Sequence, residues 1–191
     1  ARDDTVAVAD AVTDGGVTAL EVTADTPDAM SSIEAMADRV DDALVGAGTV
    51  LDAETARAAQ LAGAEFLVTP TVNRDVIRTA NRYGTPIAVG AYTPTEALAA
   101  FEAGADFVKV FPAKTGGPDH VAALGGPLPQ IPLVPTGGVS ADNAGAYVEA
   151  GAAAVGVGSA IVDRDAVGAG EYDRIAANAR AVVEAVATAR E

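Results

Sequence analysis

The sequence predicts one α/β domain, residues 1–191, that folds as a (βα)8 barrel. Short apolar segments recur along the chain, and their starts are 20 to 26 residues apart. Alanine-rich spacers with helical periodicity lie between these segments, and each spacer has room for a helix. Apolar strands that alternate with helices are typical of a parallel sheet that is covered by helices. Repeated strand–helix units of this length favour a closed barrel.

Seven segments have the composition of buried strands. In chain order, the predicted strands are residues 18–23, 44–50, 66–70, 86–92, 107–112, 132–138 and 154–160. An open doubly wound sheet would carry a glycine-rich dinucleotide fingerprint after its first strand, and the sequence has none there. A closed eight-stranded barrel needs one more strand, so we expect the first barrel strand to be missing from this chain; the alternative is a barrel that is completed in an unusual way.

The spacers carry helix start and stop signals. The clearest predicted helices are residues 3–16, 52–64, 93–105 and 172–191. Asp, Thr or Ser often stands at the N-cap position, where its side chain can bind a free backbone N–H group. Four glycines precede predicted strands, and we expect them to end helices in the left-handed conformation: Gly15, Gly63, Gly104 and Gly151.

The charge balance excludes several classes of partner. The chain has 27 acidic residues against 12 basic ones, a net charge of −15, and no cluster of Lys or Arg. Nucleic acids and anionic membranes bind clustered positive charge, so we expect neither as a partner. Acidic residues scattered over predicted helix faces indicate a hydrated surface, of a type that resembles proteins from cytoplasms of high salt.

Residue usage also limits the chemistry. The chain has no cysteine, which excludes disulfide bonds, a thiol nucleophile and thiolate metal ligands. His120 is its only histidine, so a two-histidine metal site is excluded, and we expect His120 to have a surface role. No apolar run approaches the roughly 20 residues that span a bilayer, and the first residues lack a signal-peptide pattern. We expect a soluble, cytoplasmic protein without a metal ion or a cofactor.

One of only two lysines, Lys109, stands inside a predicted apolar strand. Strand alternation puts Phe107, Lys109 and Phe111 on one face. A charged amine is costly to desolvate, so a lysine kept in apolar surroundings indicates a use for the neutral amine. A neutral amine can attack a carbonyl group and form a Schiff base. The alternative is an outward-facing lysine that snorkels between helices.

Schiff-base chemistry needs a second group to move protons. Glu21, in "TALEVT", is the carboxylate that the sequence places best for this task. In a barrel of this kind, the carboxyl ends of the strands face the active site. Glu21 lies on one such strand, and Thr49 lies on the next. The alternative, that Glu21 only pairs with Lys109, is compatible with the same position.

Two glycine-containing turns end the last two predicted strands: "PTGG", residues 135–138, and "GVGS", residues 156–159. Glycines there let backbone N–H groups approach a phosphate, and Ser159 can add a hydroxyl group. The alternative is that the glycines only form tight turns. Lys114, which follows the strand of Lys109, either adds positive charge at this end or is a surface lysine.

Six stretches together resemble a known family. In this order and spacing, "GGVTALEVT", "VGAGTVL", "VTP", "VKVFPA", "PTGGVS" and "GVGSAIV" resemble the 2-keto-3-deoxy-6-phosphogluconate (KDPG) aldolases. The resemblance covers nearly the whole chain. It implies a (βα)8 barrel, a homotrimer and a class I lyase that needs no metal ion. The implied reaction cleaves KDPG, in Entner–Doudoroff sugar acid breakdown, to pyruvate and glyceraldehyde 3-phosphate.

The resemblance also implies a role for each site residue. Lys109 would form the Schiff base, and Glu21 would be the general acid/base. The implied substrate-binding residues are Thr49, at the pyruvyl carboxylate, together with Pro70, Phe111 and Thr136. The implied phosphate-binding residues are Gly137, Gly138, Gly158 and Ser159.

Two departures from the family pattern concern the cation that binds the substrate carboxylate. Some members have "LEVTLRT", whose Arg helps to bind it, whereas this chain has "LEVTADT", with Asp25 at that place. Other members carry an Arg at the end of the first strand, and Arg2 is the only candidate for it here. The sequence therefore leaves this cation unassigned.

Three kinds of function stay open on the residues. The first is an aldolase for KDPG, for its galactonate counterpart or for 4-hydroxy-2-oxoglutarate, because the sequence does not fix the stereochemistry at C4. The second is another phosphate-binding barrel enzyme, such as an isomerase or a synthase, which does not require a lysine at the centre of a strand. The third is a non-catalytic sugar-phosphate-binding barrel, and the presence of Lys109 and Glu21 favours an enzyme over it.

Overall fold

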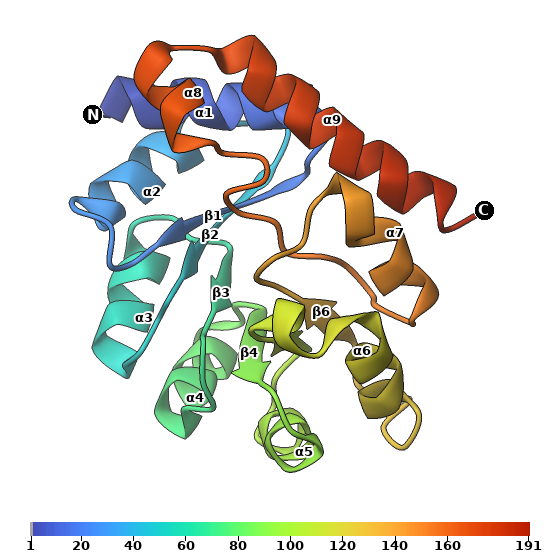
Figure 1. The fold of residues 1–191 in the computed structure, drawn as a ribbon. Helices are drawn as coiled ribbons and strands as arrows, with labels where there is room; N and C mark the ends of the chain where they lie inside the picture. Colours follow the sequence, from blue (N-terminus) through green and yellow to red (C-terminus); the bar gives the residue numbers. More distant parts are fainter. Residues whose placement is uncertain (1) are drawn as a thin grey trace.

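The fold is a curled parallel sheet with helices on its outer side (Figure 1). The computed structural model describes residues 2–191, with side chains from residue 4 onward. Six strands are hydrogen-bonded in chain order, from β1 to β6. They are β1 (Ala19–Thr23), β2 (Leu44–Gly48), β3 (Phe66–Val68), β4 (Ile87–Ala91), β5 (Phe107–Val110) and β6 (Leu133–Pro135). All the pairs are parallel, so the carboxyl ends of the strands meet at one edge.

Helices alternate with the strands and continue after them. They are α1 (Arg2–Asp14), α2 (Ala29–Ala37), α3 (Ala53–Leu61), α4 (Arg74–Tyr83), α5 (Pro94–Glu102), the 3-10 helix η1 (Ala113–Thr115), α6 (Gly117–Gly125), α7 (Ala141–Glu149), α8 (Arg164–Ala169) and α9 (Tyr172–Thr188). In Figure 1, α1 and α9 lie side by side at one end of the curled sheet. They approach closely because Gly15 has no side chain: a methyl group there would overlap Ala179.

The core lies between the sheet and its covering helices. Val45, Leu67 and Val108 of the strands are almost completely buried, and Ala59 of α3 and Ala97 of α5 have no exposed surface. Small alanine side chains let a helix approach the sheet closely, and the branched side chains of the strands fill the remaining space. The aromatic-poor, alanine-rich composition therefore suits a thin, closely packed helical layer.

The sequence predicts six of the strands correctly. Each observed strand begins and ends within two residues of its predicted segment, except that β6 ends at Pro135, three residues before the predicted end. The predicted helices at 3–16, 52–64, 93–105 and 172–191 are confirmed as α1, α3, α5 and α9, each ending two or three residues earlier than predicted. Of the helices that the structure describes, none combines the length and the apolar character that crossing a lipid bilayer requires.

The seventh predicted strand, residues 154–160, is wrong as a strand. Only Gly156 forms a bridge, to Thr136, although the N–H group of Ala153 also donates to the oxygen of Leu133. The segment thus runs beside β6 without forming a ladder. Gly156 and Gly158 weaken its strand preference, since glycine loses backbone freedom and offers no side chain to pack. Within residues 2–191, the sheet has six strands, and the closed eight-stranded barrel is not confirmed.

The predicted left-handed glycines are mostly confirmed. Gly63, Gly104 and Gly151 have φ angles of 100°, 102° and 97°. The prediction for Gly15 is wrong by one position, because Gly16 has the positive φ of 93° while Gly15 packs against α9. The side chain of Arg2, the predicted carboxylate-binding candidate, lies outside the described residues.

Candidate active site

The sequence-predicted site residues lie in or just after the strands, toward their shared carboxyl edge. Glu21 and Lys109 belong to β1 and β5, and each of the others follows the end of a strand or the Gly156 bridge. Parallel strands bring these positions to one edge of the sheet, although they are spread over most of the chain. The topology therefore gathers the predicted residues at one place.

Lys109 is almost completely buried, although lysine normally lies in water. Seven per cent of its surface is exposed. Gly90 of β4 and Val134 of β6 flank it in register. Its Nζ atom lies 5.1 Å from the centre of the Phe111 ring, so Lys109 and Phe111 share a face as predicted. This burial contradicts the alternative of a snorkelling lysine.

Glu21 lies on β1, and its carboxyl group occupies space that Gly48 leaves free. A methyl group on Gly48 would overlap the carboxyl group of Glu21. Strands β1 and β2 are directly paired, with Val22 opposite Ala47 and Thr23 opposite Gly48. A glycine inside a strand often marks such a close approach. The glycine thus fixes where the carboxyl group of Glu21 can lie.

Burial and Lys109 act on the pKa of Glu21 in opposite directions. Water reaches the Glu21 side chain, yet neighbouring protein atoms crowd its carboxyl group on most sides. This desolvation raises the pKa of Glu21, and the positive charge of Lys109 offsets part of the rise. The carboxyl group therefore holds a proton to higher pH than an ordinary glutamate, as expected of a group that both donates and accepts protons.

Thr49 follows directly after Gly48 and has an unusual backbone conformation. Its φ angle is 53°, in the left-handed region that residues with a Cβ atom rarely adopt. Asp28 is the other non-glycine residue with a positive φ among those described. Strained residues of this kind cluster at functional sites, where the surrounding structure holds them. The half-buried Thr49 is thus held at the edge of the sheet beside the carboxyl group of Glu21.

Pro70 follows β3 and packs against the strand that neighbours Lys109. A side chain on Gly90 would overlap the backbone of Pro70. The hydroxyl group of the fully buried Thr69 donates to the oxygen of Thr71, at 2.7 Å, and accepts from the N–H group of Gly90, at 3.3 Å. These bonds hold the turn that carries Pro70 close to β4.

The turn after β6 is held through its carbonyl groups. The oxygens of Thr136 and Gly137 accept from the N–H groups of Ala113 and Lys114, at 2.8 and 2.9 Å. The oxygen of Gly138 accepts from Asn143, at 3.0 Å. In the described part of the chain, the N–H groups of Gly137, Gly138 and Val139 donate to no protein group. The free polar groups of this turn are therefore donors, which suit an anion.

Glycines also let the neighbouring turns pack closely. The ring of Phe111 lies 3.1 Å from where a side chain of Gly137 would begin. A side chain on Gly156 would overlap the hydroxyl group of Thr136. Gly137 and Gly138 have φ angles of 90° and 82°, which favour glycine in any case. Phe111, Thr136 and the glycine turn therefore form one packed unit beside Lys109.

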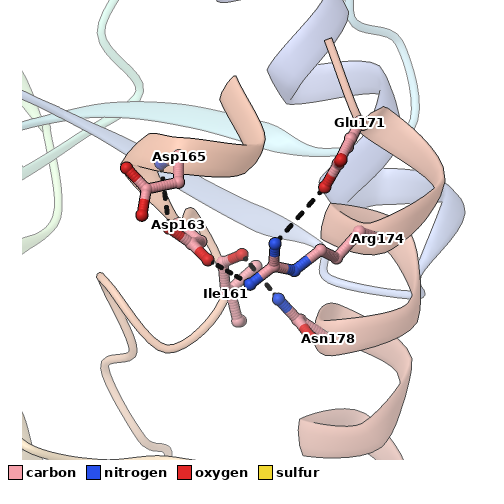
Figure 2. Close-up of polar contacts among 6 residues, drawn as sticks. All are labelled: Ile161, Asp163, Asp165, Glu171, Arg174 and Asn178. Carbon is pink, nitrogen blue, oxygen red and sulfur yellow. Dashed lines mark hydrogen bonds and ion pairs between the residues drawn. The ribbon is translucent and has the colours of Figure 1, made fainter. Parts of the chain in front are cut away.

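Gly158 and Ser159 lie in an exposed loop just after the Gly156 bridge. The side chain of Asn178 in α9 donates to the oxygen of Ile161, at 3.3 Å, and so binds this loop from outside. Asp163 caps α8 by accepting from the N–H group of Asp165, at 2.9 Å. Figure 2 shows these contacts together with Arg174 of α9, which bridges Asp163 and Glu171. Helix α9 thus holds the end of the loop that carries Ser159.

Sequence reasoning missed the contact between Tyr92 and His120. Their rings stack with centroids 4.5 Å apart, and Nε2 of His120 is 2.8 Å from the oxygen of Tyr92. His120 is therefore half-buried and joins α6 to the end of β4, rather than being a free surface residue. Gly48 and Gly90 were also not identified from the sequence, although glycines inside predicted strands are a usable signal of close packing.

The arrangement suits chemistry on a carbonyl group. It combines a buried amine, a proton-holding carboxyl group and a turn with free N–H donors. No group of three or more acidic or histidine side chains in the described residues is arranged to hold a metal ion. An amine that adds to a carbonyl, a carboxyl that moves protons and an anion-binding turn are the parts of a class I aldolase site.

Comparisons with known proteins agree with this chemistry. A family model described as KDPG and KHG aldolase matches residues 1–178. The 2-dehydro-3-deoxy-6-phosphogalactonate aldolase of Escherichia coli (strain K12) is 39% identical over 186 residues, which cover 96% of this chain and 88% of the relative. The 2-dehydro-3-deoxy-phosphogluconate aldolase of Pseudoalteromonas atlantica is 36% identical over 183 residues, covering 95% and 85%.

A solved structure with the same fold carries a covalent intermediate. It is the KDPG aldolase from Legionella pneumophila, with pyruvate captured at low pH as a covalent carbinolamine. It matches this chain with a TM-score of 0.86 and 31% identity, over 95% of this chain and 89% of the other. The curled sheet and its covering helices are thus those of an aldolase.

Proposed function

Because the chain belongs to the KDPG and KHG aldolase family, we propose that it cleaves a 2-keto-3-deoxy sugar acid 6-phosphate to pyruvate and glyceraldehyde 3-phosphate through a Schiff base on Lys109. The observation that carries this proposal is a lysine amine buried in the sheet interior, coupled electrostatically to Glu21. The carbinolamine in the Legionella pneumophila enzyme supports the same chemistry, since it is the adduct that precedes an imine.

The proposed reaction begins when the amine of Lys109 gives up its proton to a base and adds to the C2 carbonyl carbon to form a carbinolamine. Loss of water then gives a protonated imine. A base removes the proton of the C4 hydroxyl group, the C3–C4 bond breaks, and its electron pair moves into the imine to form an enamine. Glyceraldehyde 3-phosphate leaves, C3 takes up a proton, and water hydrolyses the imine to release pyruvate and the free amine.

In this scheme Glu21 moves the protons. Its raised pKa suits both proton donation and proton acceptance, because a carboxyl group whose pKa is nearer to the working pH is present in both its protonated and its ionised form. Its carboxyl group is held over Gly48, beside Thr49. We assign Thr49 to the substrate carboxylate, and Pro70, Phe111 and Thr136 to the walls of the substrate site.

The phosphate would bind at the two glycine-containing turns, Gly137–Gly138 and Gly158–Ser159. The unpaired N–H groups of the first turn support this assignment, because they are donors that an anion can use. The loop that carries Gly158 and Ser159 is held at its far end by α9, through the bond from Asn178 to the oxygen of Ile161. Both turns would then bind the same phosphate group.

The substrate is KDPG in our proposal, and 2-keto-3-deoxy-6-phosphogalactonate is the second candidate. The Escherichia coli relative, which is named for the galactonate compound, is 39% identical, slightly above the 36% of the Pseudoalteromonas atlantica relative, which is named for the gluconate compound. The two substrates differ only in the stereochemistry at C4. Assays with both compounds and with 4-hydroxy-2-oxoglutarate, compared by kcat/KM, decide among them.

We also propose that the chain assembles as a homotrimer, as the family resemblance implies. Several large apolar side chains outside the proposed substrate site are exposed and available for such an interface: Leu44, Leu51, Leu61, Tyr83, Leu98 and Phe107. Sedimentation equilibrium of the purified protein tests this assembly, and a monomer at micromolar concentration would contradict it.

Borohydride trapping tests the Schiff base directly. We expect pyruvate and sodium borohydride to add a covalent mass to one lysine, and peptide mass spectrometry to place it on Lys109, because the reductant converts an imine into a stable amine. Lys109→Met should abolish the label and turnover together. Lys114→Arg is the matched control and should keep the label. A label on Lys114, or none in the folded wild-type protein, would rule out the mechanism.

A further inference from the structure

The glycine turn after β6 carries no charged residue of its own. Its sequence, "PTGGVS", offers an anion only backbone N–H groups and hydroxyl groups. The molecule as a whole has a net charge of −15, which repels a phosphorylated substrate at long range. A cation near the turn would counter this repulsion at close range.

Lys114 lies against this turn. Its stem occupies the space that the missing side chain of Gly138 would take: Cγ and Cδ lie 3.2 and 3.1 Å from where that side chain would begin. The stem therefore runs along the turn rather than away from it. Lys114 is exposed, and in the described part of the chain no carboxylate forms an ion pair with it. Its ammonium group is free to meet a ligand.

The backbone holds Lys114 and the turn as one unit. The N–H group of Lys114 donates to the oxygen of Gly137, at 2.9 Å, and that of Ala113 donates to the oxygen of Thr136, at 2.8 Å. These two bonds join η1, which follows β5, to the end of β6. The position of the lysine stem relative to the free N–H groups of Gly137 and Gly138 is therefore fixed by the fold.

We propose that Lys114 contributes the positive charge to the phosphate site and determines the preference for a phosphorylated substrate. This inference rests on the proposed aldolase function for its physiological ligand. The N–H groups of the turn would orient the phosphate, and the ammonium group of Lys114 would add a charge-assisted hydrogen bond from its edge. Lys109 and Lys114, the only lysines of the chain, would then serve the two ends of one substrate.

The variant Lys114→Met tests the charge, because methionine keeps an unbranched apolar stem over Gly138. We expect it to raise KM for the phosphorylated substrate by roughly 10-fold, the usual loss for a hydrogen bond to a charged group. KM for the unphosphorylated sugar acid should stay within about twofold. Lys114→Arg keeps the charge and should retain most of the preference for the phosphorylated substrate. A purely structural role of the stem predicts no such difference between the Arg and Met variants.

Arg78→Met is the matched control for net charge. Arg78 is an exposed cation on α4 whose side chain is 67% exposed and, among the residues that the structure describes, pairs with Asp75. Its replacement removes the same charge from a different surface. We expect the control to leave both KM values unchanged, and an equal rise in Arg78→Met and Lys114→Met would show a general charge effect and overturn the inference.

Calorimetric titration with inorganic phosphate tests the same point without turnover. We expect Lys114→Met to weaken phosphate binding by roughly 10-fold and Lys114→Arg to restore it. If wild-type protein and Lys114→Met bind phosphate alike, or the wild type binds none, the inference is wrong. If phosphate binding depends on Lys114 but borohydride labels no lysine, the aldolase proposal fails while the phosphate site stands.

Discussion

At the scale of single residues, the site is built from side chains that occupy the space that glycines leave free. The carboxyl group of Glu21 lies over Gly48, and the hydroxyl group of Thr136 lies over Gly156. The ring of Phe111 and the stem of Lys114 lie over Gly137 and Gly138. Each glycine thus fixes the side chain of a proposed site residue that comes from a different part of the chain.

Glu21→Gln is the sharpest test at this scale. The amide keeps the shape of the side chain and removes the base, so we expect kcat to fall by roughly 10²–10⁴. Stopped assays of pyruvate release measure this fall. Lys109 should still accept borohydride label slowly, because water can replace the proton donor in imine formation. Wild-type turnover in the variant would assign proton transfer to another group.

The pH dependence of the wild-type enzyme follows from the same residue. Burial raises the pKa of Glu21, and a base works only in its ionised form, so activity should fall on the acid side at a higher pH than an ordinary glutamate would give. The acid limb of kcat/KM should disappear in Glu21→Gln.

The sequence predicted which residues are buried or lie at the strand ends better than it predicted their contacts. An isolated lysine inside an apolar strand is rare, and the structure confirms that Lys109 is buried, while its reactivity stays a prediction. The left-handed Thr49 and the contact between Glu21 and Gly48 depend on how two strands pair. Register and backbone strain arise from the whole sheet, so local sequence carries little information about them.

At the scale of elements, helix starts explain why the predicted spacers fold as helices. Thr93 and Glu96 form a capping box at α5, in which one carboxylate oxygen of Glu96 accepts from the N–H groups of Tyr92 and Thr93, at 3.0 and 2.8 Å. These bonds, first that from Tyr92, hold the pKa of Glu96 below its usual range. The helix start and the loop that carries Tyr92 are therefore tied together.

Glu96→Ala should lower the free energy of unfolding by about 1 kcal/mol at pH 7, the usual cost of losing a helix cap. Since the folded pKa of Glu96 is depressed, its contribution is present above the unfolded pKa and is lost as the pH falls through the folded pKa. Urea unfolding at pH 7 and at pH 3 measures the difference. Glu102→Ala, at the other end of α5, is the matched control, because the capping box is formed by Thr93 and Glu96.

The last predicted strand was harder to predict than the six before it. Residues 154–160 are apolar enough for a strand, yet only Gly156 forms a bridge to the neighbouring chain segment. A strand forms only where a neighbour offers continuous backbone partners, and two glycines reduce the gain from forming it. Composition predicts that a segment is buried, but the pairing decides whether it is a strand.

At the scale of the whole molecule, the most prominent property is the negative surface charge. A net charge of −15 on 191 residues produces self-repulsion that dissolved salt screens, with a Debye length of about 10 Å at 0.1 M and about 3 Å at 1 M. Each 1 kcal/mol of relieved repulsion raises Tm by about 2–4 °C for a chain of this size. The folded state should therefore be more stable in concentrated salt.

We expect the Tm to rise by several degrees between about 0.1 M and about 1 M potassium chloride. Circular dichroism or calorimetry measures it, with sucrose of matched osmolality as the control for solvent effects without screening. A flat or falling Tm would contradict the view that long-range repulsion limits stability.

The scarcity of lysine has a practical consequence for attaching the protein to a support. Of the two side-chain amines, Lys109 is 7% exposed and Lys114 is exposed beside the glycine turn. Coupling through lysine side chains will therefore take place mainly at Lys114 and will turn the entrance of the proposed substrate site toward the bead. Coupling through the abundant surface carboxylates would leave that entrance open.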